Sequence, residues 1–298
     1  MKLKAWIEAT RLRTLPVAIA GIVTTLGYNF LNHNVNWLPV ILCLAFALLC
    51  QIASNYANEY FDYKAGRDRQ GREGPRRGVT EGDLTPRAMK TAIFITIAAA
   101  CCIGLSLISW GGWWLIAVGL AVVTGVFAYS TGPYPLSPHG LGEVAVVIFF
   151  GIVPVCLTYY VETLEWSWQV FRGGVAIGLL GANVLIVNNY RDIEDDIAVG
   201  KMTLAVRLGR KAMIALYVVN AIVAILLMIP DWYMTGSRRW LFIPVLIALG
   251  AIGLAREMSR KQGAELTPIL GKTAMLMCLY SISFAVTCAI NSALQSEM

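Results

Sequence analysis

The chain has 298 residues, of which 57% are hydrophobic and 14% are charged, and its mean hydropathy is +0.64. This composition is too apolar for a soluble domain and is typical of a protein that crosses a membrane several times. The net charge of +6 does not require a nucleic-acid partner, because basic loops that orient the chain and contact anionic lipid account for it. The seven cysteines form no CxxC pair, which argues against a disulfide framework or a zinc site, and we interpret them as small core residues.

Nine apolar runs are long enough to span a bilayer, so we predict an all-α bundle of nine transmembrane helices in one domain, residues 1–298. The runs lie near residues 14–32, 37–57, 88–108, 112–131, 142–161, 170–189, 211–230, 240–256 and 272–292. With the N-terminus in the cytoplasm, every Lys and Arg except Arg172, Arg238 and Arg239 falls on the cytoplasmic side. This asymmetry follows the positive-inside rule, so we expect the N-terminus inside and the C-terminus outside.

Residues 2–13 mix basic and apolar side chains, which predicts a short interfacial helix before Thr14-Leu15-Pro16 opens the first span. No small-residue cleavage site is apparent after the first apolar run, so we interpret that run as a retained span and not as a signal peptide. Arg11 and Arg13 are open to two interpretations: they anchor the helix at the interface, or they contact an anionic substrate.

The second span ends in polar side chains at helical spacing, which normally face a bundle interior or a wet cavity and mark function. They are Gln51, Asn55, Asn58, Glu59 and Asp62. Hydrogen bonding between helices is the structural alternative, and it fits Gln51 best. We predict that Gly66 ends or bends this helix and lets Asp68 turn back toward Asp62.

Two hydrophilic loops accompany these spans. The loop at 63–87 carries Arg67, Arg72, Arg76 and Arg77, which are either markers of the cytoplasmic side or ligands of a polyphosphate. The loop at 129–143 has no Lys or Arg but carries Tyr129, Tyr134 and His139. It is either the wall of an aromatic pocket or an ordinary Pro-rich turn, and His139 alone is a weak candidate for a catalytic base.

The sixth span contains Gly174-x3-Gly178, a spacing that permits close helix packing, and it leads into a second acid-rich stretch. On a continuing helix, Asn188, Asp192 and Asp196 are spaced i, i+4, i+8 and share one face. Amide and carboxylate oxygens are the hard ligands that Mg²⁺ accepts.

Two acid-rich helix ends on one side of a membrane bundle suit Mg²⁺ ions that share a diphosphate, and the apolar bundle suits a hydrocarbon tail. The metal ions and nearby basic residues would neutralise the charge that grows on the diphosphate as its carbon–oxygen bond breaks. This pattern favours ionisation of a prenyl diphosphate and capture of the allylic cation by an electron-rich acceptor. The alternative, a cation transporter or channel, predicts acids near the bilayer midplane on helices open to both faces.

Both acid-rich motifs resemble those of the UbiA superfamily of intramembrane prenyltransferases. The motifs are Asn58-x3-Asp62-x5-Asp68 and Asn188-Asn189-x-Arg191-Asp192-x3-Asp196 with Gly200-Lys201. Further stretches of the first 210 residues resemble its 1,4-dihydroxy-2-naphthoate prenyltransferase branch. They are Arg13-Thr14-Leu15-Pro16, Gln51-x3-Asn55-x2-Asn58, Gly74-Pro75-x-Arg77, Tyr134-Pro135-Leu136 with Gly140-Leu141-Gly142-Glu143, and Thr203–Gly209.

The resemblance implies one UbiA-like domain with a central cavity open to lipid, dependence on Mg²⁺, and transfer of a polyprenyl group from its diphosphate to 1,4-dihydroxy-2-naphthoate with loss of the carboxylate. The acceptors 4-hydroxybenzoate, homogentisate and haem remain alternatives within the superfamily. An Arg/Ser-rich transit segment is not apparent, so we expect a bacterial plasma membrane with the active-site loops on the cytoplasmic side.

Carried over by motif, the metal ligands would be Asp62, Asp68, Asp192 and Asp196, supported by Asn58 and Asn188. The substrate contacts implied in the same way are Asn55, Asn58, Arg67, Arg77, Tyr134, Asn188, Arg191 and Lys201. Glu59 departs from the pattern, since the family commonly has Asp after Asn, but the change keeps the charge and the oxygen ligands.

Overall fold

The structure is a computed structural model that describes every residue except 1, 33–34, 72–73, 236–237 and 297–298. The described residues form helices and connecting loops and contain no strand. By length and composition, eight helical segments among them could cross a membrane: Leu3–Leu31, Trp37–Lys64, Pro86–Gly111, Gly142–Thr163, Trp168–Arg191, Leu204–Met234, Phe242–Ser259 and Gly263–Ser296. A shorter apolar helix, α6 (Leu115–Ala128), lies where we expected the fourth span. The all-α membrane fold is therefore confirmed, while the count of nine spans and their orientation stay predictions.

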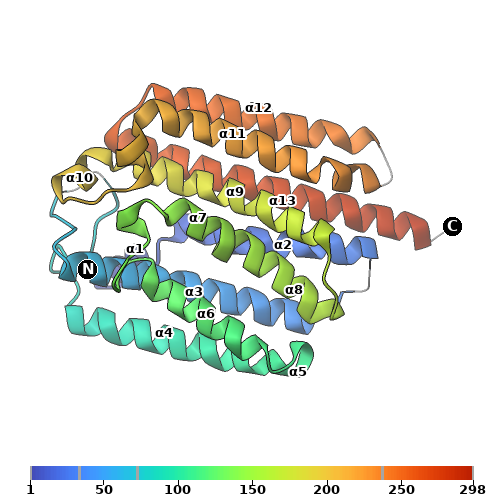
Figure 1. Ribbon diagram of the computed structural model, residues 1–298, viewed down its shortest axis with the longest axis horizontal. Helices are drawn as coiled ribbons and strands as arrows, with labels where there is room; N and C mark the ends of the chain where they lie inside the picture. Colours follow the sequence, from blue (N-terminus) through green and yellow to red (C-terminus); the bar gives the residue numbers. More distant parts are fainter. Residues whose placement is uncertain (1, 33–34, 72–73, 236–237, 297–298) are drawn as a thin grey trace.

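The helices run side by side along the long axis of the molecule (Figure 1). The central helix is α9 (Trp168–Arg191), which packs against α2 (Leu15–Asn32), α11 (Leu204–Met234) and α13 (Thr267–Ser296). On one side of this centre, α12 (Phe242–Ser259) packs against α11 and α13. On the other side, α3 (Trp37–Lys64) packs against α4 (Pro86–Ser106) and α6. Other short elements are α1 (Lys2–Thr10), η1 (Leu12–Thr14), α5 (Ile108–Gly111), η2 (Ser137–His139), η4 (Arg238–Leu241) and η5 (Gly263–Leu266).

The fifth apolar segment is not a single regular helix. It consists of α7 (Gly142–Val146), a π-helical stretch η3 (Val147–Ile152), and α8 (Val153–Thr163). Its backbone touches that of α9 so closely that a Cβ added to Gly151 would lie 2.4 Å from the Gly178 Cα. A Cβ added to Gly178 would lie 2.6 Å from the carbonyl oxygen of Val147. The close packing predicted from Gly174-x3-Gly178 is thus confirmed, and its partner is the irregular part of the fifth segment.

The two acid-rich helix ends differ in their backbone. Helix α3 ends at Lys64 and the chain turns at Gly66 with φ +66°, as expected. Helix α9, in contrast, ends at Arg191, and Asp192 (φ −93°, ψ 10°) separates it from α10 (Ile193–Ala198). The expectation of one continuing helix through Asp196 is wrong. Arg191 binds the side chain of Asp192, its immediate neighbour, and a regular helix does not let adjacent side chains face each other.

The cysteines only partly follow the prediction of core residues. Cys43, Cys156 and Cys288 are buried, but Cys101 and Cys102 are exposed on α4. Large apolar side chains such as Phe94 and Leu105 are exposed on the same helix. An apolar outer surface is the ordinary condition of a helix that faces lipid. Cys102 is exposed on this helix, and the exposed Cys101 also lines an apolar cavity.

Candidate active site

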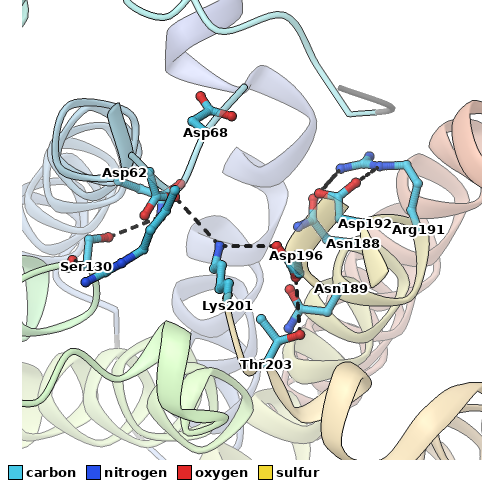
Figure 2. A network of polar contacts seen from close by, with 12 residues as sticks. Asp62, Asp68, Ser130, Asn188, Asn189, Arg191, Asp192, Asp196, Lys201 and Thr203 are labelled. Carbon is cyan, nitrogen blue, oxygen red and sulfur yellow. Dashed lines mark hydrogen bonds and ion pairs between the residues drawn. The ribbon is translucent and has the colours of Figure 1, made fainter. Parts of the chain in front are cut away.

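The two acid-rich stretches, from opposite halves of the chain, meet at one end of the bundle around Lys201 (Figure 2). The Lys201 Nζ lies 3.6 Å from Asp62 Oδ2 and 3.8 Å from Asp196 Oδ1. Both aspartates are buried, with 2% and 6% of their surface exposed. Charged groups are stable in such places only when they are paired, so Lys201 acts as the shared counterion of two carboxylates.

Arg77 is a second buried cation, and it connects Asp62 with Asp68. Its Nη2 lies 3.9 Å from Asp62 Oδ2, and its Nε lies 3.7 Å from Asp68 Oδ2. Asp68 also accepts a hydrogen bond of 2.8 Å from the Thr80 hydroxyl. Asp68 thus turns back toward Asp62 as predicted, and the loop after α3 brings Arg77 between them. Within the described residues, Arg77 Nη1 is buried and finds no hydrogen-bond partner.

Two arginines converge on the amide oxygen of Asn58. Arg11 Nη2 donates to it at 2.6 Å and Arg77 Nη2 at 3.0 Å, while the Asn58 amide donates to the Ser130 hydroxyl at 3.1 Å. Arg11 adopts a left-handed backbone (φ 51°), a conformation that costs energy for a residue with a side chain. Arg67 joins the group by donating to the Ser130 carbonyl at 3.3 Å. The sequence left the role of Arg11 open, and in the structure its guanidinium contacts Asn58 at the candidate site.

The second cluster is organised by Arg191, whose guanidinium binds both carboxylate oxygens of Asp192 at 2.7 and 3.0 Å. The same group donates to the Asn188 amide oxygen at 2.9 Å. Asp196 accepts a hydrogen bond of 3.2 Å from Thr203. Asp195, which the sequence did not single out, is bound by Arg69 from the loop after α3, with a hydrogen bond of 2.9 Å from its Nε.

A small polar cavity lies between the clusters. Its lining consists of Asp62, Arg67, Asp68, Arg69, Arg77, Asp195, Asp196, Val199 and Lys201. Side chains of both signs therefore face one space, which suits an anion bound together with cations. Six of these residues were predicted from the motifs. Arg69 and Asp195 were missed, although Arg69 lies in the loop at 63–87 and Asp195 lies in the second acid-rich stretch.

Some predicted contacts lie elsewhere. The Asn55 amide donates to the Thr10 carbonyl at 2.9 Å and ties α3 to the N-terminal segment. Tyr134 is 56% exposed and stacks on His139, with ring centroids 3.9 Å apart. Neither Tyr134 nor the Arg191–Asp192 pair lines the polar cavity. Arg72 lies outside the described residues. The substrate contacts proposed for these residues stay predictions.

A larger apolar cavity of about 360 Å³ lies among α2, α3, α4, α6 and the fifth segment. Three of the residues that line it, Leu105, Ile116 and Leu120, are also exposed on the surface of the molecule. The cavity therefore opens between α4 and α6, in agreement with the expected lipid-open cavity. Tyr129 also lines this cavity.

The donor chemistry at the polar cavity fits a divalent cation, since carboxylate oxygens are hard ligands. Within the described residues, no three His, Cys, Asp or Glu side chains already stand close enough to hold an ion. In Figure 2 the Lys201 ammonium lies between Asp62 and Asp196. A bound cation would have to share or replace the neutralising role of Lys201 and Arg77.

An apolar helix bundle with buried carboxylates and cations at one end, next to a lipid-open cavity, defines a membrane protein for a ligand with a charged head and a hydrocarbon tail. Residues 14–289 match the UbiA prenyltransferase family, and the chain belongs to that family.

Curated relatives agree with this assignment. The chain is 36% identical over 285 residues to the 1,4-dihydroxy-2-naphthoate octaprenyltransferase of Mycobacterium tuberculosis, covering 94% of this chain and 95% of the relative. It is 33% identical over 295 residues to the protein of that name in Haemophilus influenzae, covering 96% of each. Among solved structures, a UbiA homolog from Archaeoglobus fulgidus bound to GPP and Mg2+ has a TM-score of 0.66 at 13% identity, covering 96% of this chain and 99% of that one. This last likeness shows the fold.

Proposed function

We propose that this protein is a prenyltransferase that moves a polyprenyl group from an allylic diphosphate to 1,4-dihydroxy-2-naphthoate, with loss of the carboxylate, and so forms demethylmenaquinone for menaquinone biosynthesis. One observation carries the proposal: Asp62 and Asp196, from opposite halves of the chain, are buried and share Lys201. The names of the relatives, at 33% to 36% identity over nearly the whole chain, favour the naphthoate acceptor over the other acceptors used in the superfamily.

The residues of the polar cavity suit the diphosphate end of the donor. Lys201, Arg77 and Arg67 line the cavity and present ammonium and guanidinium groups, which bind phosphate oxygens by charge-assisted hydrogen bonds. The same groups stabilise the negative charge that develops on the diphosphate as the bond to the allylic carbon breaks. The apolar cavity excludes water from the cationic prenyl chain and receives its hydrocarbon tail.

Mg²⁺ belongs to the proposal. The residues that would hold it are Asp62, Asp68, Asp192 and Asp196, with Asn58 and Asn188 in support. When bound, the ion adds positive charge next to the leaving diphosphate. We further propose that the protein lies in a bacterial plasma membrane with this end of the bundle facing the cytoplasm, because the basic loops of the sequence include those that follow α3 and α9.

The decisive experiment is mass spectrometry of the product after membranes with the full chain are incubated with dihydroxynaphthoate, farnesyl diphosphate and Mg²⁺. We expect a prenylated product that has lost the carboxylate. Asp62→Ala and Asp192→Ala should abolish its formation. The control is Asp83→Ala, because Asp83 pairs with Arg76 in the loop before α4 and, among the described residues, lines neither cavity. Near-normal turnover by either site variant would contradict the proposal.

The acceptor is tested in the same membranes. With one prenyl diphosphate and 4-hydroxybenzoate, homogentisate or haem in place of the naphthoate, we expect turnover at or near background. Preferential use of any of these would leave prenyl transfer intact but reject dihydroxynaphthoate as the acceptor.

A further inference from the structure

Glu143 has a buried carboxylate, and only one of its two oxygens has a hydrogen-bond partner among the described residues. It lies in the first turn of α7 and is 6% exposed. Its Oε1 accepts a hydrogen bond of 2.9 Å from the Asn189 amide, next to the second acid-rich motif. Its Oε2 is buried and has no hydrogen-bond partner within the described residues. Leaving a buried charged oxygen unpaired is costly, and a glutamine could bind Asn189 equally well, so the carboxylate needs a reason beyond the packing of α7 on α9.

The position of Glu143 supplies that reason. Ala145 and Val146, which follow it on α7, line the apolar cavity, and so does Tyr129. A Cβ added to Gly142, the residue before Glu143, would lie 3.4 Å from the Tyr129 hydroxyl. Ser130, the residue after Tyr129, accepts hydrogen bonds from the Asn58 amide and from Arg67, so Tyr129 lies where the apolar cavity approaches the first acid cluster. Tyr129 thus forms the polar end of the apolar cavity, and Glu143, whose neighbour Gly142 packs against that phenol, lies beside it.

We propose that Glu143 binds the aromatic acceptor, its Oε2 accepting a hydrogen bond from a ring hydroxyl at this polar end. The proposal rests on the proposed function and names the group that selects the acceptor. An acceptor ring must meet the allylic carbon of the donor where the hydrocarbon tail joins the diphosphate, which is the border between the two cavities. A carboxylate held by Asn189 at that border is a fixed acceptor for a phenolic O–H, and a charge-assisted bond of this kind is strong and directional.

The chain also contains a matched carboxylate in the same continuous helical segment. Glu162, near the end of α8, accepts hydrogen bonds from the Asn36 backbone at 2.8 Å and from the Asn29 amide at 3.4 Å. Its Oε1 also lacks a partner among the described residues. Glu162 is separated from the acid clusters by the length of the segment, so it cannot meet the reacting end of the donor. A Glu162 variant is therefore the matched control: it loses a similar carboxylate but should still bind the acceptor.

The test is steady-state kinetics of the full chain in membranes, with each substrate varied at saturating concentration of the other. We expect Glu143→Gln to raise the KM for dihydroxynaphthoate at least about tenfold and to change the KM for the prenyl diphosphate by less than about twofold. Glu162→Gln should leave both KM values near those of the wild type. If Glu143→Gln does not accumulate, Glu143→Asp, which keeps the charge but withdraws it by one methylene group, should show the same selective increase.

A second measurement needs no variant. Methylation of one ring hydroxyl keeps the ring electron-rich but removes a donor, so the wild type should discriminate against one of the two monomethyl ethers of dihydroxynaphthoate by at least about tenfold. Glu143→Gln should lose that discrimination. Equal use of both ethers and the parent acceptor by the wild type, or parallel changes of both KM values in the variants, would overturn the inference. Failure of the wild type to prenylate dihydroxynaphthoate at all would instead reject the proposed function.

Discussion

Lys201 is the residue that joins the two halves of the site. Two buried carboxylates on their own repel each other, and one would have to take up a proton. The ammonium of Lys201 removes this conflict because it lies within 4 Å of both Asp62 and Asp196. Its backbone is set by a tight turn in which Gly200 adopts φ +70° and the Lys201 N–H donates to the Asp196 carbonyl at 2.8 Å. Glycine adopts a positive φ without strain, which explains why a glycine precedes Lys201.

The first prediction concerns this ammonium. Lys201→Met keeps an unbranched side chain, shorter by one atom, but removes its charge, so kcat/KM for the prenyl diphosphate should fall about 10- to 150-fold, the equivalent of losing about 1.5–3 kcal/mol of charge-assisted binding. The melting temperature should also fall, and Mg²⁺ should partly restore it, because an added cation again neutralises the two carboxylates. Thermal unfolding with EDTA and with Mg²⁺ measures this. Lys261→Met, which removes a surface pair with Glu257, is the control and should show neither effect.

Glu59 gives a second prediction at this scale. It is 1% exposed, and its carboxylate accepts a hydrogen bond of 3.0 Å from the backbone N–H of Val79. It therefore fastens the loop at 65–85, which carries Arg67, Arg69 and Arg77, onto α3. Glu59→Asp shortens the side chain and should break this bond, at a cost of about 1–3 kcal/mol. We expect faster tryptic cleavage within the loop and a lower melting temperature. Unchanged cleavage would show that the length of Glu59 is not needed.

The sequence predicted which residues belong to the site better than it predicted the contacts that these residues make. Clustered acids near apolar runs indicated Asp62, Asp68 and Asp196, because such groups are too costly in a membrane protein to lack a purpose. The same reasoning could not find the role of Glu59, which depends on a loop residue twenty positions away. Nor could it foresee that Arg191 would bind its neighbour Asp192, because that contact exists only where the helix breaks.

At the scale of elements, α9, which leads into the second acid cluster, packs backbone to backbone against η3. Gly178→Ala would place its Cβ 2.6 Å from the Val147 carbonyl oxygen and 2.8 Å from its Cα. Backbone atoms cannot move aside as a side chain can, so we predict destabilisation by about 1–3 kcal/mol. Gly253→Ala on α12, where nothing lies within 4 Å of the added Cβ, should be neutral or slightly stabilising. Thermal unfolding of the two variants in detergent compares them. Equal melting temperatures would refute the packing argument.

Helix positions were predictable because long apolar runs must be helical in a bilayer, where every backbone polar group needs an internal partner. The irregular points were not. The π-helical stretch at Val147–Ile152 arises where glycine backbones of two elements meet, and the bend in α11 at Gly209 (φ +76°) falls inside an apparently continuous helix. Both depend on neighbouring elements, about which local periodicity carries no information.

At the scale of the whole molecule, the site depends on how the bundle separates water from lipid. The acid clusters gather at the end of the bundle where α3 and α9 both finish (Figure 1). The apolar cavity opens sideways between α4 and α6, whose outer surfaces are apolar. A substrate with a charged head and a long tail can therefore place each part in its own environment without crossing a polar barrier. The sequence predicted the two environments, but the size and side opening of the cavity depend on packed shapes that no single segment specifies.

This geometry predicts that a single residue can change which prenyl chain lengths the protein accepts. Gly119 on α6 lines the apolar cavity, and nothing lies within 4 Å of a Cβ added there, so Gly119→Phe can fill the cavity without a backbone clash. We expect turnover with a long polyprenyl diphosphate to fall at least about tenfold relative to turnover with geranyl diphosphate, because the long tail must share the space with the new ring. Gly253→Phe, equally unobstructed but remote from the cavity, should leave the ratio of the two rates unchanged. Paired assays with both donors decide the matter: a ratio that stays constant in Gly119→Phe would show that the tail does not occupy this cavity.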